Sequence, residues 1–294
     1  MSALEARISA QLDAPVDPAV SKFAERLAEE SGALAVLFYG SNLRTGSLEG
    51  VLDYYVLTPG AQREKIWPRV SYREWDHQGE TLRAKVATMA FETFAEAARG
   101  ELLDTTIWAR FVQPSALVWQ RDDAARRDVV SAIAGAATTA ARLAVALGPE
   151  RGHAEDYWRT LFRATYQAEF RVEKAGREDS ILSVNAQHFD GLLPLALDAA
   201  GVPYHRDGQV LTPSMGARER KRIRNWWNRR RRMGKPLNVA RLVKASTTFD
   251  GAARYAAWKI ERHTGVPVEV TPFREKHPVL AAPGVLFSLW RKKR

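Results

Sequence analysis

The 294-residue chain contains no cysteine, which excludes disulfide bonds, cysteine-based zinc sites and thiol nucleophiles. It shows no signal-peptide pattern at its start and no apolar run approaching the roughly 20 residues that span a bilayer. The Gly-x-Ser-x-Gly, Gly-x-Gly-x-x-Gly and Gly-Lys-Ser motifs are absent, and the six histidines have no metal-ligand spacing. These absences leave an elbow-type hydrolase, a dinucleotide enzyme and a P-loop protein without support. They suit a soluble or peripherally bound protein of a reducing cytoplasm.

Positive charge is the strongest compositional feature that is present. The formal net charge is +10, which favours an anionic partner such as a nucleotide, a nucleic acid or an acidic membrane surface. Residues 218–235 hold ten lysines and arginines against one acid, Glu219, with Trp226 and Trp227 among them. We call residues 218–235 the basic stretch. Three interpretations stay open for it: a nucleic-acid platform, an anionic-membrane surface or a solvated helix face.

The end of the chain joins an apolar run to a cationic cluster. Residues 279–290 are rich in valine, leucine, phenylalanine and tryptophan, and residues 291–294 are all lysine or arginine. The run is too short to cross a bilayer but long enough to lie in its interface, with the cations among anionic headgroups. Packing of this tail on the protein's own core is the competing interpretation.

Hydrophobic spacing in the first third predicts helices and strands in turn. An amphipathic helix is expected at residues 18–31, a buried strand at 34–39, a polar turn at 41–50 and a second strand at 51–57. Residues 82–89 fit a third strand. The mixture predicts an α+β fold.

The rest of the chain has a mainly helical pattern. Residues 91–103 favour a helix and residues 107–118 a strand or loop around Pro114. Further helices are expected at residues 122–147, 156–173, 182–200 and 239–262. We therefore expect three regions: an α+β domain at residues 1–120, a helical domain at 121–203 and a basic C-terminal region at 204–294.

The most informative segment is the junction of the first two strands. Gly40 and Ser41 end one strand, and Asp53 lies on the next. Nucleotidyl transfer needs such groups, because a glycine lets backbone N–H groups approach phosphates, a serine hydroxyl can bond a phosphate oxygen and a carboxylate can hold Mg²⁺. An ordinary strand connection is the simpler interpretation, and this pattern alone does not exclude it.

Several blocks in the same order resemble a known family. Tyr39-Gly40-Ser41-Asn42 and Leu52-Asp53-Tyr54 are similar to the Tyr-Gly-Ser-Gly loop and Leu-Asp-Phe strand of the mitochondrial translocator assembly and maintenance family. These proteins are CTP:phosphatidate cytidylyltransferases within the DNA polymerase β-like nucleotidyltransferase superfamily. The family's Lys-Tyr-Gly-Val, Leu-Tyr-Ile-Ala-Gly-Arg-Leu-Gln-Lys-Pro and Ser-Tyr-Thr-Gly-Asp-Phe-Arg-Met blocks resemble residues 85–88, 105–114 and 165–172.

The resemblance implies a fold, a reaction and roles for single residues. The fold would be a polymerase β-like mixed sheet followed by a winged-helix-like helical domain. The reaction would be transfer of CMP from CTP to phosphatidic acid, giving CDP-diacylglycerol and pyrophosphate. Asp53 would hold Mg²⁺, and Lys85 and Arg110 would be catalytic cations. The expected nucleotide-binding residues are Gly40, Ser41, Asn42, Glu169 and Arg171.

The chain also departs from the family pattern. Asn42 stands where the family loop has its second glycine, and Glu169 stands where the last block has aspartate. One strand carboxylate, Asp53, replaces the Asp-x-Asp pair of many superfamily members, with Glu49 or Glu169 as candidates to complete the site. Other open functions are therefore a nucleotidyltransferase acting on RNA or protein and a non-catalytic lipid or nucleic-acid adaptor, although nucleic acid is the less favoured partner. For the favoured enzyme, we expect a cytoplasmic location with peripheral attachment to the inner membrane.

Overall fold

A computed structural model describes residues 1–168, 177–248 and 250–276. Its centre is a five-stranded sheet in the order β3-β4-β2-β1-β5. The strands are β1 (Ala35–Tyr39), β2 (Leu52–Thr58), β3 (Arg69–His77), β4 (Glu80–Ala90) and β5 (Ser115–Gln120). Strands β2 and β4 run parallel and the other neighbours antiparallel. The mixed sheet with its helices confirms the expected α+β class.

Alternate residues of the strands face two separate cores. Val36, Tyr54 and Val86 point to the face covered by α2 (Pro18–Ser31), whose Phe23 and Leu27 complete that core. The other face packs against α4 (Phe91–Ala98), α5 (Thr106–Phe111) and α6 (Asp123–Leu147). Helix α2 matches its predicted bounds, because Asp17 caps its start and Gly32 ends it in a left-handed conformation.

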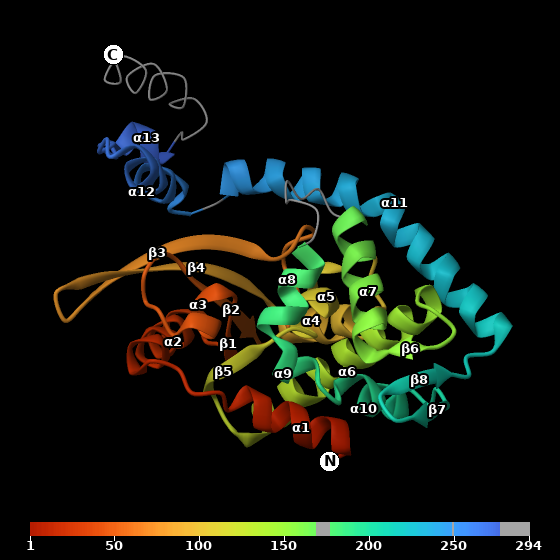
Figure 1. The fold of residues 1–294 in the computed structure, drawn as a ribbon. Coiled ribbons are helices and arrows are strands. Elements are labelled where there is room, and N and C mark those ends of the chain that lie inside the picture. Colours follow the sequence, from red (N-terminus) through yellow and green to blue (C-terminus); the bar gives the residue numbers. More distant parts are fainter. Residues whose placement is uncertain (169–176, 249, 277–294) are drawn as a thin grey trace.

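The helical half surrounds α6 (Figure 1). Its other helices are α1 (Ala3–Leu12), α7 (Ala154–Ala168), α8 (Arg177–Val184), α9 (Ala186–Phe189) and α10 (Leu192–Ala199). A three-stranded sheet, β6-β8-β7, lies beside them, with β6 (Gly152–His153), β7 (Tyr204–Asp207) and β8 (Val210–Pro213). One hydrophobic core extends from the sheet into these helices, so it is continuous across residue 120.

Helix α6 is the segment closest to the apolar run that the sequence was expected to lack. It is long and apolar enough to cross a membrane by length and composition alone. However, 72% of its most apolar window is buried inside the protein. Its alanines allow α4, α5 and α7 to pack closely against it, so it serves as the central core helix of this fold.

Three sequence expectations were wrong about local structure. The polar turn at residues 41–50 begins with a short helix, α3 (Ser41–Thr45). Residues 107–118 divide into α5 and β5, and residues 182–200 divide among α8, α9 and α10. Strand β3 was not predicted. Charged residues interrupt its sequence, so its apolar pattern is weak.

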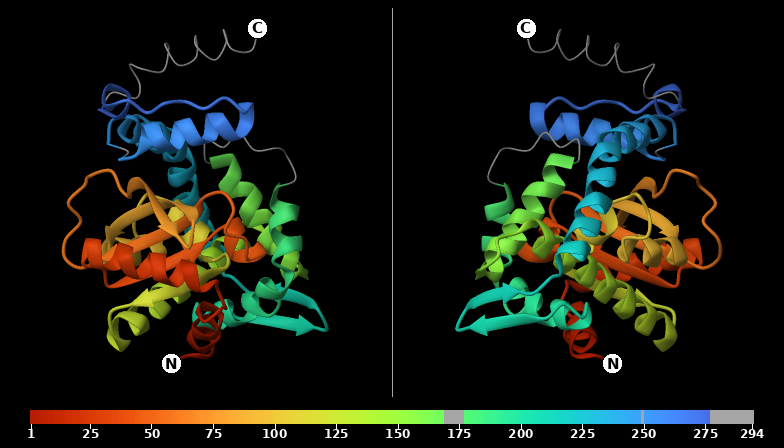
Figure 2. Two further views of the ribbon diagram at one scale, coloured as in Figure 1. Left: turned by 90° about the vertical axis from the view of Figure 1, so that its left-hand side faces the viewer. Right: turned by 90° about the vertical axis from the view of Figure 1, so that its right-hand side faces the viewer.

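The C-terminal helices cross from one half of the molecule to the other. Helix α11 (Ala217–Thr248) packs against α6, α7 and β3, and α12 (Ala252–Thr264) packs against β3. Helix α13 (Pro272–Lys276) follows. Both side views place α11 and α12 over the same side of the molecule (Figure 2). The predicted interfacial tail at residues 279–294 lies outside the described residues.

Candidate functional site

Strand pairing places Tyr39, Asp53 and Lys85 side by side in one row across the sheet. Tyr39 of β1 pairs with Asp53 of β2, and Asp53 pairs with Lys85 of β4. The row lies where β1 ends and β2 begins, on the sheet face that packs against α4, α5 and α6 further along. Side chains of paired residues on adjacent strands share a face. Two residues that are 32 positions apart in sequence, Asp53 and Lys85, are therefore neighbours.

Both the close approach of Asp53 and the backbone conformation favour glycine at position 40. A Cβ atom at position 40 would lie 2.9 Å from Oδ2 of Asp53. The φ angle of Gly40 is 91°, in the region where other residues are strained. Ser41 follows at the start of α3 with its side chain exposed. The Gly40-Ser41 loop and the Asp53 carboxylate thus form one unit.

The side chain of Asn42 points into the protein, unlike that of Ser41. It is buried, and its amide donates hydrogen bonds to the carbonyl oxygens of Ser47 and Glu49 at 2.8 Å each. Both bonds close the loop that leads into β2. The side chain of Asn42 therefore shapes this loop, whereas Glu49 itself is exposed.

Arg110 reaches the same site from α5. Its guanidinium lies 5.0 Å from the centre of the Tyr39 ring, and Nη1 donates to the Tyr39 hydroxyl at 3.3 Å. The acids that were its alternative partners have other bonds: Asp104 pairs with Arg241, and Glu101 pairs with Arg99. Arg110 and Tyr39 therefore lie on one side of Asp53 and Lys85 on the other.

The site holds one carboxylate between two cations in a partly buried setting. Burial raises the pKa of Asp53, and the charges of Lys85 and Arg110 oppose that rise. Burial, which removes part of the solvent around the ammonium group, lowers the pKa of Lys85, and the negative charge of Asp53 opposes this effect. Lys85 keeps solvent contact, so its cation remains accessible to an anionic ligand. The excess of positive charge around Asp53 favours a polyanion.

A cavity of about 280 Å³ opens beside Asp53. Polar and charged groups from β1, α3, α5 and α8 line it together with a few apolar side chains. They include Tyr39, Gly40, Ser41, Arg44, Asp53, Arg110, Gln113 and Asn185. Arg44, Gln113 and Asn185 were not predicted as site residues. The charge of Arg44, one turn after Ser41, and the place of Gln113 in the block at residues 105–114 were signals, whereas Asn185 had none.

The site fits Mg²⁺ only together with a ligand that brings its own oxygens. In the part of the chain that the structure describes, no group of three or more potential metal-binding side chains occurs. Mg²⁺ commonly binds through one or two carboxylates, with water and substrate phosphates completing its shell. Asp53 can supply one such carboxylate. Glu169 and Arg171, which were predicted to bind nucleotide, lie outside the described residues.

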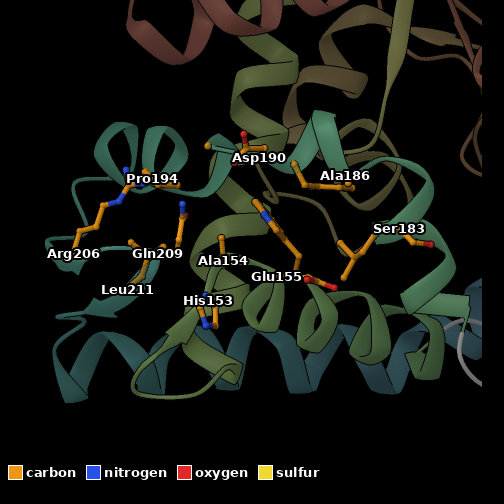
Figure 3. A pocket seen from close by; sticks show the side chains of 14 residues that line it. His153, Ala154, Glu155, Ser183, Ala186, Asp190, Pro194, Arg206, Gln209 and Leu211 are labelled. Atoms are coloured by element: carbon orange, nitrogen blue, oxygen red, sulfur yellow. The ribbon is translucent and has the colours of Figure 1, made fainter.

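A second and larger cavity, of about 530 Å³, lies between α7, the α8–α10 segment and the small sheet (Figure 3). Its walls combine the apolar Trp158, Phe189 and Leu211 with the charged Glu155 and Arg206. None of the residues predicted from the sequence lines it. Helix α8 contributes Ser180 and Ile181 to the Asp53 cavity and Leu182 and Ser183 to this one, so it forms a shared wall.

The basic stretch is divided between the core and the solvent. Trp227 is buried against Trp108, and Nε1 of Trp226 donates to the Gly100 carbonyl at 3.0 Å. Arg230 is only 5% exposed and donates to the carbonyl oxygens of Gly100 and Leu102. The two tryptophans therefore pack on the core, so they are not available to stack on bases or to enter a membrane.

Most of the other cations of the basic stretch have exposed side chains, although Nε of Arg224 also donates to the Ala146 carbonyl of α6. Those with exposed side chains are Arg218, Lys221, Arg222, Arg224, Arg229, Arg231, Arg232 and Lys235. We call them the exposed α11 face. Met233 and Val239 of α11 and Phe273 of α13 are exposed large apolar side chains. This combination of cations and apolar groups is typical of a surface that meets an anionic interface.

Comparison with known proteins does not add a family. No protein-family model matches this chain, and no curated protein matches it.

Proposed function

We propose that the protein is a nucleotidyltransferase that moves CMP from CTP to phosphatidic acid. The observation that carries the proposal is the meeting of the Gly40-Ser41 loop, Asp53, Lys85 and Arg110 at one end of the sheet. These residues come from four separate elements of the fold. The choice of CTP and phosphatidic acid rests on the family resemblance.

Catalysis of the proposed reaction depends on electrostatic stabilisation and positioning of the reactants more than on proton transfer. An oxygen of the phosphatidate monoester attacks the α-phosphorus of CTP, and the bond from that phosphorus to the pyrophosphate oxygen breaks. The attacking oxygen already carries negative charge at neutral pH, so the reaction needs no strong general base. Lys85 and Arg110, on either side of Asp53, neutralise the charge on the transferred phosphoryl group as pyrophosphate departs.

The nucleotide side of the site would be the cavity beside Asp53. Gly40 and Ser41 at its mouth and Arg44 on its wall would bind the phosphates. Asp53 would hold Mg²⁺ together with the phosphate oxygens. The ion would supply positive charge that offsets the negative charge of the triphosphate.

The acceptor would remain in a membrane during the reaction. We propose that the exposed α11 face and the apolar side chains near it attach the protein peripherally to the cytoplasmic side of an anionic inner membrane. Each lysine or arginine near such a surface contributes about 1 kcal/mol of attraction. Binding to phosphatidate-containing vesicles would therefore weaken steeply as salt is added.

Pyrophosphate release tests the function directly. It would be measured with each of the four nucleoside triphosphates and Mg²⁺, with and without phosphatidate liposomes, for the native chain and Asp53→Asn. Release that requires CTP and phosphatidate and disappears in the variant is the expected result. Release that depends on RNA or protein would move the function to another acceptor, and binding to liposomes without turnover with any nucleotide would leave an adaptor.

A further inference from the structure

Helix α12 is fastened to the sheet beside Lys85. On β3, Tyr72 pairs with Lys85 of β4, and its backbone N–H donates to the Asp250 carbonyl at 2.8 Å. The ring of Tyr72 lies 5.5 Å from that of Tyr255 on α12. Gly251 has a φ angle of 80°, and a Cβ atom there would lie 2.7 Å from the Tyr72 carbonyl oxygen. The start of α12 is therefore held at a fixed place next to the site.

This attachment brings Lys259 towards Lys85. Lys259 lies one turn after Tyr255, with Nζ 5.8 Å from the centre of the Tyr255 ring. Tyr255 packs on Tyr72, the β3 partner of Lys85, so Lys259 lies beside the part of the sheet that holds Lys85. Two cations from distant parts of the chain therefore approach one another, and both keep contact with solvent.

Arg262 adds a third cation on the same side. One of its terminal nitrogens lies 3.1 Å from the Cβ position of Gly50, in the loop that leads to Asp53. Its guanidinium also lies 5.3 Å from the centre of the Trp258 ring. Lys259 and Arg262 are three residues apart on one helix, so they face the same direction.

Lys259 and Arg262 have no carboxylate partner among the described residues. Across residues 1–168, 177–248 and 250–276, neither Lys259 nor Arg262 forms an ion pair with a carboxylate, although Arg254 on the same helix pairs with Glu275. Like charges that gather on one surface create a positive potential that attracts an anionic ligand. A ligand with two negative charges would suit this surface, and a phosphate monoester has that charge near neutral pH.

Cations lie on two opposite sides of Asp53. The cavity with Tyr39, Arg44 and Arg110 lies towards β1, and Lys85 lies on the opposite neighbour, β4. Phosphoryl transfer places the attacking and leaving oxygens in line on opposite sides of phosphorus. If the leaving pyrophosphate occupies the cavity side, the attacking group must approach from the side of β4 and α12.

We propose that α12 forms the acceptor subsite, in which Lys259 and Arg262, together with Lys85, bind the phosphate monoester of the acceptor. This inference rests on the proposed function, because only that function makes the bound phosphate monoester an acceptor. Binding of an anion at the predicted site can be measured without turnover. Such a subsite gives α12 a role in substrate binding that is separate from membrane attachment by α11.

The decisive kinetic test uses an acceptor that does not need a membrane. Dihexanoyl phosphatidate stays monomeric below its critical micelle concentration, so membrane binding does not affect its KM. We expect the double variant Lys259→Gln/Arg262→Gln to raise the KM for dihexanoyl phosphatidate about 10-fold or more and to leave the KM for CTP within about 2-fold. Arg254→Gln, on the same helix but turned to Glu275, is the matched control and should change neither KM.

Two other outcomes would overturn the subsite. An unchanged KM for dihexanoyl phosphatidate would show that α12 does not bind the acceptor. A loss of turnover on liposomes with normal turnover of the short-chain acceptor would make Lys259 and Arg262 membrane-binding residues instead. Both side chains are exposed, so equal thermal unfolding of the variant and the native chain is expected and would exclude misfolding.

A binding measurement separates failure of the subsite from failure of the proposed function. Dihexanoyl phosphatidate would be titrated calorimetrically into the native chain, the double variant and Arg254→Gln in the absence of nucleotide. Binding that weakens about 10-fold in the double variant alone supports the anion site even if no nucleotide is turned over. Equal binding to all three proteins rejects the site even if the native enzyme is active.

Discussion

The Asp53 site and the basic stretch of α11 both concentrate charge, yet they use it in opposite ways. At the site, cations from β4 and α5 flank one carboxylate, and burial raises its pKa. In α11, Arg230 turns inward to backbone carbonyls while its neighbour Arg231 remains in solvent. Dense charge along a sequence therefore does not identify a site. Convergence of charges from separate elements does so more reliably.

The largest effect should come from changing the contact between Gly40 and Asp53. Gly40→Ala places a methyl group against Oδ2 of Asp53, and Asp53→Asn removes the charge. Each should lower pyrophosphate release by about 100-fold or more. Gly46→Ala is a matched control, because Gly46 also has a positive φ of 66° but no atom lies within 4 Å of its Cβ position. Equal activity losses in both alanine variants would mean that backbone strain, and not Asp53, is responsible.

The next effect should distinguish the buried from the exposed arginines of α11. Arg230→Met removes charged donors from the carbonyl oxygens of Gly100 and Leu102, which would stay buried and unsatisfied. Its free energy of unfolding should fall by about 3 to 4 kcal/mol. Burial lowers the pKa of Arg230 to about 10, so the guanidinium is still charged at neutral pH. Denaturant unfolding would measure the loss, and a change below about 1 kcal/mol would contradict this role.

The helical half should lose stability in acid through His188. Burial lowers the pKa of His188 to about 4 from an ordinary value of 6.5, and its Nε2–H donates to the Val112 carbonyl at 2.8 Å. The stabilisation is therefore complete above pH 6.5 and is lost as pH falls through about 4. The total change is about 3 kcal/mol. Unfolding midpoints from pH 7 to 4 should fall less in His188→Asn, and parallel curves for the two proteins would reject this assignment.

The Asp53 site should show the opposite dependence on pH. Because the folded-state pKa of Asp53 is raised from 3.8, its contribution favours folding at low pH and is lost as pH rises through the folded-state value. Asp53→Asn should therefore raise the unfolding midpoint at neutral pH while it removes activity. The gain should disappear in acid, where the native side chain is protonated. A lower midpoint for the variant at neutral pH would show that the attraction of Lys85 and Arg110 for the charged carboxylate outweighs the cost of burying it.

The smallest effect should come from the exposed α11 face. Replacing Arg231, Arg232 and Lys235 with glutamine removes three charges without removing a buried contact. The free energy of unfolding should change by no more than about 0.5 kcal/mol per residue. Measured beside Arg230→Met under the same conditions, this variant sharpens the contrast within one helix. A loss comparable to that of Arg230→Met would mean that the exposed cations also support the fold.

Much of the site follows from local sequence patterns. A glycine and a serine after a short apolar strand, and an aspartate on the next strand, predict a tight connection with a polar end. The structure places Gly40 and Asp53 in that arrangement. In contrast, the pairing of Asp53 with Lys85 depends on the parallel contact between β2 and β4, which leaves β3 at the edge. No local pattern determines which strands become neighbours.

Helix α5 shows why a local pattern can also mislead. Ile107, Trp108 and Phe111 are typical of strands, and Pro114 suggests a break. The helix forms because Asp104 accepts hydrogen bonds from the backbone and hydroxyl of Thr106 and pairs with Arg241 of α11. That last contact joins residues 137 positions apart. The same long-range packing explains why Trp226 and Trp227 could not be assigned to the core from sequence alone.

The position of α11 and α12 late in the chain has a consequence for synthesis. Translation releases the strands with Gly40, Asp53 and Lys85 first and α11 only after residue 216. Until then, the carbonyls of Gly100 and Leu102 lack Arg230, and Asp104 lacks Arg241. Domains begin to fold as they emerge from the ribosome, so a nascent chain can form the sheet before it can form the finished site. A fragment that stops before α11 is therefore expected to form the sheet but to lack the proposed activity.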